Sequence, residues 1–372
     1  MKLNIAVLPG DGIGPEVIEQ AVKVLKAIAL EFNHSFNFKK ASVGATAINE
    51  FGNPLPEQTL DLCKASDAIL FGAIGHPKYD NDPSLEVRPE QGLLHLRKAL
   101  GLFANVRPVK AYESTLDKSP LRRENIKGTD ISIYRELTGG IYFGEKKLSE
   151  DGDLASDLCE YSRHEIERIT HLAFKAAQSR QKKVTLVDKA NVLESSRLWR
   201  KVVTEIGIQY PEITLNYLFV DNAAMQLILN PKQFDVILTE NMFGDIISDE
   251  ASVIGGSIGL LASASLGEKH ALFEPIHGSF PEAINKGIAN PIASILSAAM
   301  LLDHFQLNQE ANHIREAVEK SLELNITTPD LNENNFDIST NQVGDFIEDF
   351  ISNPEDSNVN FTNVSLGQST II

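Results

Sequence analysis

Residues 3–18 read LNIAVLPGDGIGPEVI, and this stretch decides the fold class. The apolar run Leu3–Leu8 predicts a buried β-strand, because it has the length of a strand and a glycine-rich turn follows it. Pro15 suits the first position of a helix, and apolar residues then recur at helical spacing. A strand, a glycine turn and a helix in this order predict an α/β fold.

The same alternation continues along the chain. Further strands are predicted at Phe36–Val43, Ala68–Gly72, Val184–Asp188, Leu215–Val220 and Phe234–Leu238. Helical patterns extend over residues 292–305 and 311–324. The polar residues 353–372 predict a loose tail.

The glycine turn invites a dinucleotide-binding interpretation, but its spacing differs from the fingerprint. Residues 10–14 read GDGIG, which is GxGxG and not the GxGxxG of a Rossmann unit. Pro15 also removes a helix N-terminal amide that would cradle a pyrophosphate. A tight turn that needs positive φ angles is the alternative, and we predict that the fold is not a Rossmann fold.

Length and composition restrict the classes of function. A chain of 372 residues suggests about two domains. The net charge of −17 argues against nucleic acid, and no apolar run reaches the roughly 18 residues of a membrane span. Cys63 and Cys159 lack CxxC spacing, which favours free thiols in a reducing compartment. With a first strand in place of a signal peptide, we expect a cytoplasmic protein.

An acidic pair follows the strand predicted at 234–238. If residues 241–249 are helical, Asp245 and Asp249 are four residues apart and share one face. Carboxylates so placed could bind Mg²⁺ or Mn²⁺, with Asp221 as a candidate third ligand. Alternatively, the pair is solvated or acts as helix N-terminal charge.

Three arginines lie in or beside apolar sequence, at Arg97, Arg107 and Arg135. An arginine at the end of an apolar strand often binds a carboxylate or phosphate, so convergence of the three would make an anion site. Each could instead pair with a structural acid. Lys189 follows another apolar strand and could act as a base or lie on the surface.

Several ordered motifs resemble the isocitrate/isopropylmalate dehydrogenase family of β-hydroxyacid oxidative decarboxylases. They are GDGIGPE at 10–16, EQGLLHLR at 90–97, FANVRP at 103–108, RELTGGIYFG at 135–144, DKANV at 188–192, NMFGDIISD at 241–249, FEPIHGS at 273–279 and GIANP at 287–291. The resemblance extends to about residue 350. It implies a two-domain open α/β sandwich without a Rossmann unit.

The resemblance also implies domain boundaries. Residues 1–102 and 256–352 would form a discontinuous cofactor-side domain, and residues 103–255 a substrate, metal and dimerisation domain. The cofactor loops of the first domain would close over substrate bound to the second.

The activity implied by the resemblance is NAD-dependent oxidative decarboxylation of (2R,3S)-3-isopropylmalate to 4-methyl-2-oxopentanoate and CO2, in leucine biosynthesis. Hydride transfer to NAD⁺ would make a β-keto acid, which then loses CO2 with help from a divalent metal. By resemblance, Lys189 matches the base for the hydroxyl and Tyr142 the proton donor to the enolate. The carboxylates of the substrate would be held by the three arginines.

Metal and partner assignments follow from the same resemblance. Asp221, Asp245 and Asp249 match the ligands of Mg²⁺ or Mn²⁺, and Asp221 also adjoins the substrate. In this family the residues matched by Lys189 and Asp221 reach the active site from the neighbouring subunit. We therefore expect a homodimer with shared active sites.

Specificity residues are also implied. The cofactor-binding set is Glu274, His277, Gly278, Ser279, Phe280, Pro281, Glu282, Ala289 and Asn290. A carboxylate at Glu282 can accept a hydrogen bond from the ribose 2′-OH and repel a phosphate, which favours NAD over NADP. Glu90, Leu93 and Leu94 would meet the isopropyl group, although two leucines on a helix are also typical of an ordinary core.

Three other functions remain open from the sequence. The chain could act on isocitrate, homoisocitrate or tartrate instead. It could be a non-catalytic regulatory subunit, although retention of Tyr142, Lys189 and the three aspartates argues against this. It could also be a metal-dependent binding protein that produces no NADH.

Overall fold

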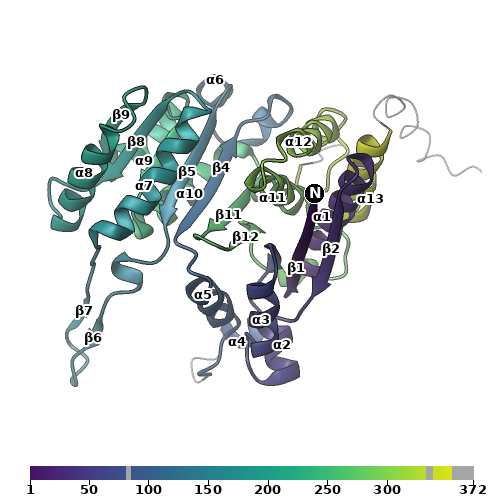
Figure 1. The fold of residues 1–372 in the computed structure, drawn as a ribbon, viewed down its shortest axis with the longest axis horizontal. Helices are drawn as coiled ribbons and strands as arrows, with labels where there is room; N and C mark the ends of the chain where they lie inside the picture. The colour runs from purple at the N-terminus through teal and green to yellow at the C-terminus, as the bar shows by residue number, and fades with distance from the viewer. Residues whose placement is uncertain (81–84, 332–337, 354–372) are drawn as a thin grey trace, which may run out of the picture.

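The computed structural model describes residues 1–80, 85–331 and 338–353, so that the predicted tail lies outside it from residue 354 on. One continuous ten-stranded sheet runs through the molecule in the order β2-β1-β3-β12-β11-β4-β5-β10-β8-β9 (Figure 1). Helices pack on this sheet, which confirms the predicted α/β class.

One half of the sheet carries both ends of the described chain. Its strands β1, β2, β3 and β12 are parallel neighbours, and β11 joins β12 antiparallel. The strands are β1 (Lys2–Gly10), β2 (Ser35–Lys40), β3 (Ala68–Ala73), β11 (Ala262–Leu266) and β12 (Ala271–Pro275). The long helices of this half are α1 (Gly14–Glu31), α11 (Ile292–His304), α12 (Asn308–Glu323) and α13 (Thr340–Ser352). Shorter helices follow β2 and β3, namely α2 (Gly44–Phe51), α3 (Glu57–Ala65), α4 (Pro77–Asp80) and α5 (Pro89–Ala99).

The other half begins where β4 pairs antiparallel with both β11 and β5. Beyond β5 the strands are parallel again. The strands are β4 (Ala104–Lys110), β5 (Asp130–Glu136), β8 (Lys183–Asp188), β9 (Thr214–Phe219) and β10 (Val236–Thr239). The helices are α6 (Arg123–Ile126), α7 (Arg163–Gln178), α8 (Glu194–Gly207), α9 (Val220–Leu229) and α10 (Asn241–Ser252). Separately, β6 (Lys146–Leu148) and β7 (Ala155–Asp157) form a two-stranded arm that projects from the body (Figure 1).

The core lies between the sheet and its helices. Strands β3, β10 and β12 are buried along their whole length, as expected for strands covered on both faces. Helix α11 is buried almost all round, because α1, α12 and strands β11 and β12 surround it. Burial of each large apolar side chain contributes about 1.5–3 kcal/mol.

The predicted strands and helices agree with the structure to within a few residues, with one clear correction. Strand β2 ends at Lys40, whereas the apolar pattern predicted a strand up to Val43. Gly44, at φ +76°, turns the chain there into α2. Within the described part of the chain, no helix is long and apolar enough to cross a membrane. The boundaries between the two domains stay a prediction.

The glycine turn after β1 has a structural role. Gly10 and Gly12 have φ angles of +71° and +60°, and a Cβ on Gly12 would lie 1.9 Å from the Ser279 carbonyl oxygen. Asp11, which is only 4% exposed, accepts hydrogen bonds from the backbone of Ala45, Thr46 and Gly75 at 2.9, 3.0 and 3.1 Å. The turn therefore joins β1, the start of α2 and the segment after β3.

Replacing Asp11 with Ala should destabilise the fold by about 3 kcal/mol, because buried backbone N–H groups lose their acceptor. Urea unfolding followed by circular dichroism measures this as a lower midpoint. The exposed Asp61 on α3 provides the control, since its replacement by Ala should change stability by no more than about 0.5 kcal/mol. Equal midpoints for the two variants would contradict the role of Asp11.

Candidate active site

Strands β4 and β5 and helix α5 bring the three arginines near one another. Arg135 lies near the end of β5 and is 7% exposed, and Arg107 lies on the adjacent antiparallel strand β4. Arg97 lies on helix α5, so that the association of this residue with the end of a strand was wrong. Arg97 and Arg135 line the same cavity, which has a volume of about 360 Å³. The arginines of the sequence motifs are therefore spatial neighbours.

Helix α10 places acids against these arginines. Arg107 donates to Asp249 at 2.9 Å and lies 3.8 Å from Asp245, so the two aspartates share one face of the helix. Arg135 donates to Asp245 through Nη1. Burial lowers the pKa of Arg135 to about 10, opposed by the nearby Asp245 carboxylate, so the guanidinium stays charged at neutral pH.

Tyr142 reaches the same cluster from the short 3₁₀ turn Gly140–Tyr142. Its hydroxyl donates to Asp245 at 3.0 Å, and the Arg135 guanidinium lies 5.8 Å from the centre of its ring. Partial burial, and then the hydrogen bond to Asp245, raise the pKa of Tyr142 above its ordinary value. Tyr142 is therefore a neutral phenol at neutral pH and can donate a proton.

Lys189 and Asp221 form a separate pair. The Lys189 Nζ lies 3.0 Å from the Asp221 carboxylate, which lowers the pKa of Asp221. The Lys189 backbone N–H donates to the buried Ser196 hydroxyl at 3.0 Å. Lys189 thus begins the turn between β8 and α8, and this hydrogen bond holds the backbone at its start.

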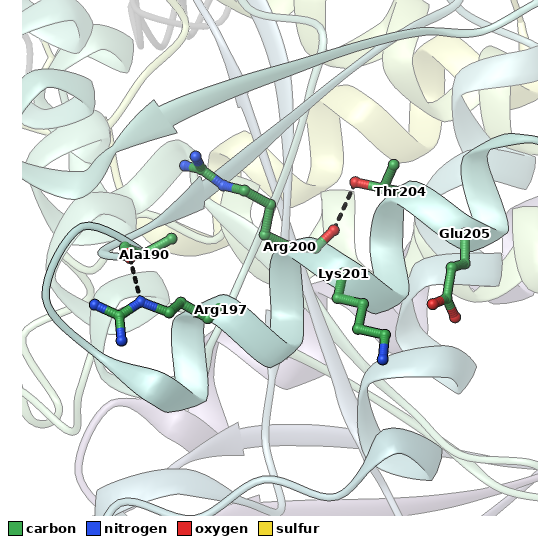
Figure 2. A pocket seen from close by; sticks show the side chains of 6 residues that line it. All are labelled: Ala190, Arg197, Arg200, Lys201, Thr204 and Glu205. Atoms are coloured by element: carbon green, nitrogen blue, oxygen red, sulfur yellow. Dashed lines mark hydrogen bonds between the residues drawn. The ribbon is translucent and has the colours of Figure 1, made fainter.

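A shallow pocket adjoins this turn on one face of α8, as Figure 2 shows. The Arg197 Nε there donates to the Ala190 carbonyl at 3.0 Å. Arg200 binds the buried Asp188 carboxylate through two nitrogens, at 2.8 and 2.7 Å. Arg197 and Arg200 of α8 therefore stabilise the turn that carries Lys189.

The described residues of the single chain contain no group of three or more His, Cys, Asp or Glu side chains that could hold a metal. Asp245 and Asp249 lie together beside Arg107, whereas Asp221 lies with Lys189. Two carboxylates on one helical face are suitable hard oxygen donors for Mg²⁺ or Mn²⁺. The three predicted ligands therefore lie in two separate clusters of the single chain.

The predicted specificity residues Glu90, Leu93 and Leu94 lie on helix α5 but have different surroundings. Leu94 is 51% exposed and lines the cavity with Arg97, whereas Leu93 packs against a cluster of buried apolar residues. A Cβ on Gly75 would lie 3.2 Å from Glu90 Oε1 and 3.4 Å from Ser279 Oγ. The Glu90 carboxylate therefore lies near the loop after β12.

That loop contains most of the predicted cofactor-binding residues. The Ile13 backbone N–H donates to the Ser279 carbonyl at 2.8 Å, which holds the loop against the glycine turn. Phe280 has φ +38°, an uncommon conformation for a bulky residue, and its side chain is about half exposed. Pro281 begins the short 3₁₀ turn Pro281–Ala283, and Glu282 is exposed.

The loop contains a buried polar atom without a partner among the residues that the structure describes. The buried Nε2 of His277 has no hydrogen-bond partner among the described residues, and burial lowers the pKa of this histidine. Apart from Gly278 and its two chain neighbours, no atom of the described residues lies within 4 Å of a Cβ built on Gly278. An unpartnered imidazole nitrogen and open space beside the backbone fit a polar cofactor better than a closed structural loop.

The remaining predicted cofactor residues are buried nearby. Ala289 and Asn290 are buried, and Asn290 donates to Asp330 at 3.0 Å. The Glu274 carboxylate accepts from Arg97 at 2.6 Å. Glu274 thus contacts a predicted substrate arginine, and the pair links β12 to α5.

Sequence reasoning missed several residues of this site. The cavity is also lined by Lys98, Leu102, Leu137, Thr138, Phe143 and Asn241. Two buried acids lie behind it, since Glu136 ends β5 and Glu240 follows β10. The sequence pattern that could have indicated both residues is an acid at the end of an apolar strand.

Comparisons with known proteins identify the family of the chain. The family model described as "Isocitrate/isopropylmalate dehydrogenase" matches residues 4–347. The chain belongs to this family. It is thus a member of a family of dehydrogenases, as the ordered motifs predicted.

Curated relatives cover most of the chain. The 3-isopropylmalate dehydrogenase of Bacteroides fragilis (strain YCH46) is 54% identical over 352 residues, which are 94% of this chain and 99% of the relative. That of Bacillus subtilis (strain 168) is 56% identical over 337 residues, 89% of this chain and 92% of the relative.

A solved structure has the same fold. The isocitrate dehydrogenase from Methylococcus capsulatus matches with a TM-score of 0.82 and 36% identity, over 94% of this chain and 99% of that one. The predicted fold class, that of isopropylmalate dehydrogenases and not a Rossmann fold, is confirmed.

Replacing Glu240 with Gln should stabilise the protein above about pH 5. Burial raises the pKa of Glu240, so its favourable protonated form is lost as the pH rises through the folded-state pKa. Glutamine keeps an acceptor for the Phe243 N–H, which Glu240 binds at 3.2 Å. Melting temperatures between about pH 5 and 8 should show an advantage of the variant that grows with pH. The exposed Glu268→Gln variant should show no such trend, and a constant difference for Glu240→Gln would contradict the argument.

Proposed function

We propose that this chain catalyses the NAD-dependent, metal-assisted oxidative decarboxylation of (2R,3S)-3-isopropylmalate to 4-methyl-2-oxopentanoate and CO2, a step of leucine biosynthesis in the cytoplasm. The arrangement of Arg135, Asp245 and Tyr142 carries the proposal, because it joins an anion-binding group, a metal-binding group and a proton donor. The curated relatives at 54% and 56% identity, both named 3-isopropylmalate dehydrogenase, support it.

The substrate would be held by charge and by shape. Arg97, Arg107 and Arg135 would bind its two carboxylates, since guanidinium groups match carboxylates bidentately. Leu94 would contact the isopropyl group on the apolar side of the cavity. Burial of that group contributes roughly 2 kcal/mol, which a substrate with a third carboxylate would forgo.

Proton transfers would use two side chains. Lys189 would take the proton of the substrate hydroxyl as a hydride leaves the carbon that bears it. After CO2 departs, the neutral phenol of Tyr142 would donate a proton to the enolate carbon. The raised pKa of Tyr142 supports its role as the acid.

The bound groups would supply the remaining chemistry: NAD⁺ accepts the hydride, and Mg²⁺ or Mn²⁺ polarises the substrate oxygen and stabilises the developing enolate. Asp245 and Asp249 would hold the metal together with Asp221 of the partner subunit. The exposed carboxylate of Glu282 would favour NAD over NADP by repelling a 2′-phosphate.

A homodimer would bring Lys189 and Asp221 to the site of the partner. Exposed apolar side chains on α9 and α10 support this, as they would otherwise face water. They are Met225, Ile228, Leu229 and Ile246. Leu148 and Leu154 on or beside the projecting arm are also exposed and could contact a second copy.

Absorbance of NADH tests the proposal. NAD⁺ with Mg²⁺ and 3-isopropylmalate should yield NADH rapidly, and a chelator or NADP⁺ in place of NAD⁺ should slow the reaction strongly. Parallel reactions with isocitrate, homoisocitrate, tartrate and malate test the substrate. Activity only with another acid would replace the substrate assignment, and no NADH from any acid would favour a regulatory or binding protein.

Replacing Lys189 with Ala should lower kcat by at least about 100-fold, because the hydroxyl loses its base. Binding of Mg²⁺ with 3-isopropylmalate, measured by calorimetry, should remain within a few fold. Lys201, an exposed lysine on α8, provides a control whose replacement by Ala should leave kcat unchanged. Undiminished turnover of the Lys189 variant would refute its role as the base.

A further inference from the structure

Asn241, the first residue of α10, uses every polar atom of its side chain. It is 1% exposed. Its Oδ1 accepts from Arg135 Nε at 3.1 Å and from Arg135 Nη2 at 2.9 Å, and its Nδ2 donates to the Gly139 carbonyl at 3.1 Å. One amide therefore joins the proposed substrate arginine to the turn that ends in Tyr142.

The contact with Arg135 fixes the guanidinium plane. Two of its nitrogens are held by one amide oxygen, and the third, Nη1, donates to Asp245. Because the amide is neutral, it orients the cation without cancelling its charge. An aspartate there would accept the same hydrogen bonds but would compete with an anionic substrate for the guanidinium.

The contact with Gly139 fixes the start of the 3₁₀ turn Gly140–Tyr142. The Gly139 N–H donates to the buried Glu136 carboxylate at 2.7 Å, so that the peptide groups on both sides of Gly139 are held. A Cβ on Gly140 would lie 2.2 Å from the Tyr161 hydroxyl oxygen, and Gly140 has φ +77°. The Tyr161 hydroxyl in turn accepts the Asn241 backbone N–H at 3.0 Å.

Asn241 also lies one helical turn before Asp245 on the same helix. Its hydrogen bonds therefore also hold the helix that carries the proposed metal carboxylates. We propose that Asn241 is a positioning residue that sets the Arg135 guanidinium and the Tyr142 hydroxyl at fixed places relative to α10. This inference rests on the proposed function, because it assumes that Arg135 binds the substrate and that Tyr142 donates the proton. A purely structural Asn241 would contribute stability alone.

Kinetics of Asn241→Ala distinguish the two roles. The variant should raise the KM for 3-isopropylmalate about 10-fold and lower kcat about 100-fold, since misplacement by about 1 Å can have such effects. Gln20→Ala is the matched control, because Gln20 on α1 is equally buried and its amide donates to Asn341 at 2.6 Å. Its melting temperature should also fall, but its kcat and KM should not change.

Stopped-flow measurement of NADH adds a quantity that a loss of stability alone does not change. If Tyr142 is displaced, protonation after hydride transfer becomes slow, and Asn241→Ala should show a fast burst of NADH followed by slow turnover. A smaller folded fraction would reduce both phases equally. Wild-type-like KM and an unchanged ratio of burst to steady rate would overturn the positioning role while leaving the proposed function intact.

Calorimetry separates failure of this inference from failure of the proposed function. If the wild type makes no NADH from 3-isopropylmalate, the proposed reaction is wrong. Binding of 3-isopropylmalate with Mg²⁺ then still tests the Arg135 contact. An affinity about 10-fold weaker in Asn241→Ala than in wild type and Gln20→Ala supports the positioning of Arg135, and equal affinities overturn it.

Discussion

The ion pair between Arg135 and Asp245 is the contact on which the rest of the site depends. Arg135 is almost fully buried, and a buried charge without a partner would cost several kcal/mol. Asp245 provides that partner and also accepts the hydrogen bond of Tyr142. The pair can form only because β5 ends beside the start of α10, and the pairing of β5 with β10 fixes this arrangement. Sheet order thus determines the electrostatics of the cavity.

The same constraint governs what can bind. Arg107 and Arg135 are paired with the aspartates of α10, so an anion that binds these arginines competes with the carboxylates. Equally, a cation at Asp245 and Asp249 competes with the guanidinium groups. A dicarboxylate and a divalent cation that arrive together leave every charge compensated. A cation alone would leave the buried arginines without their partners, and a dicarboxylate alone would leave the more exposed aspartates without theirs. Under the proposed function, substrate and metal therefore favour each other's binding.

The sequence predicted the parts of this site better than their arrangement. Periodicity located the strands, and helical spacing set Asp245 and Asp249 on one face, because these are local properties. The insertion of β12 and β11 between β3 and β4 depends on contacts some 160 residues apart, as in the pairing of Asn105 with Ser265, which no local pattern encodes. For the same reason the hydrogen bonds of Asn241, to residues 106 and 102 positions away in the sequence, were found only in the structure.

The single chain keeps its reactive groups in two clusters, each of which compensates its own charge. Lys189 lies against Asp221, and the arginines lie against Asp245 and Asp249. A lone chain can therefore fold without a buried unpaired charge in either cluster. Under the proposed function, assembly alone would not activate the site, because the Lys189 Nζ is engaged in an ion pair with the Asp221 carboxylate. A divalent cation that binds Asp221 would remove that partner, which makes activation depend on the ligands as well as on the partner subunit.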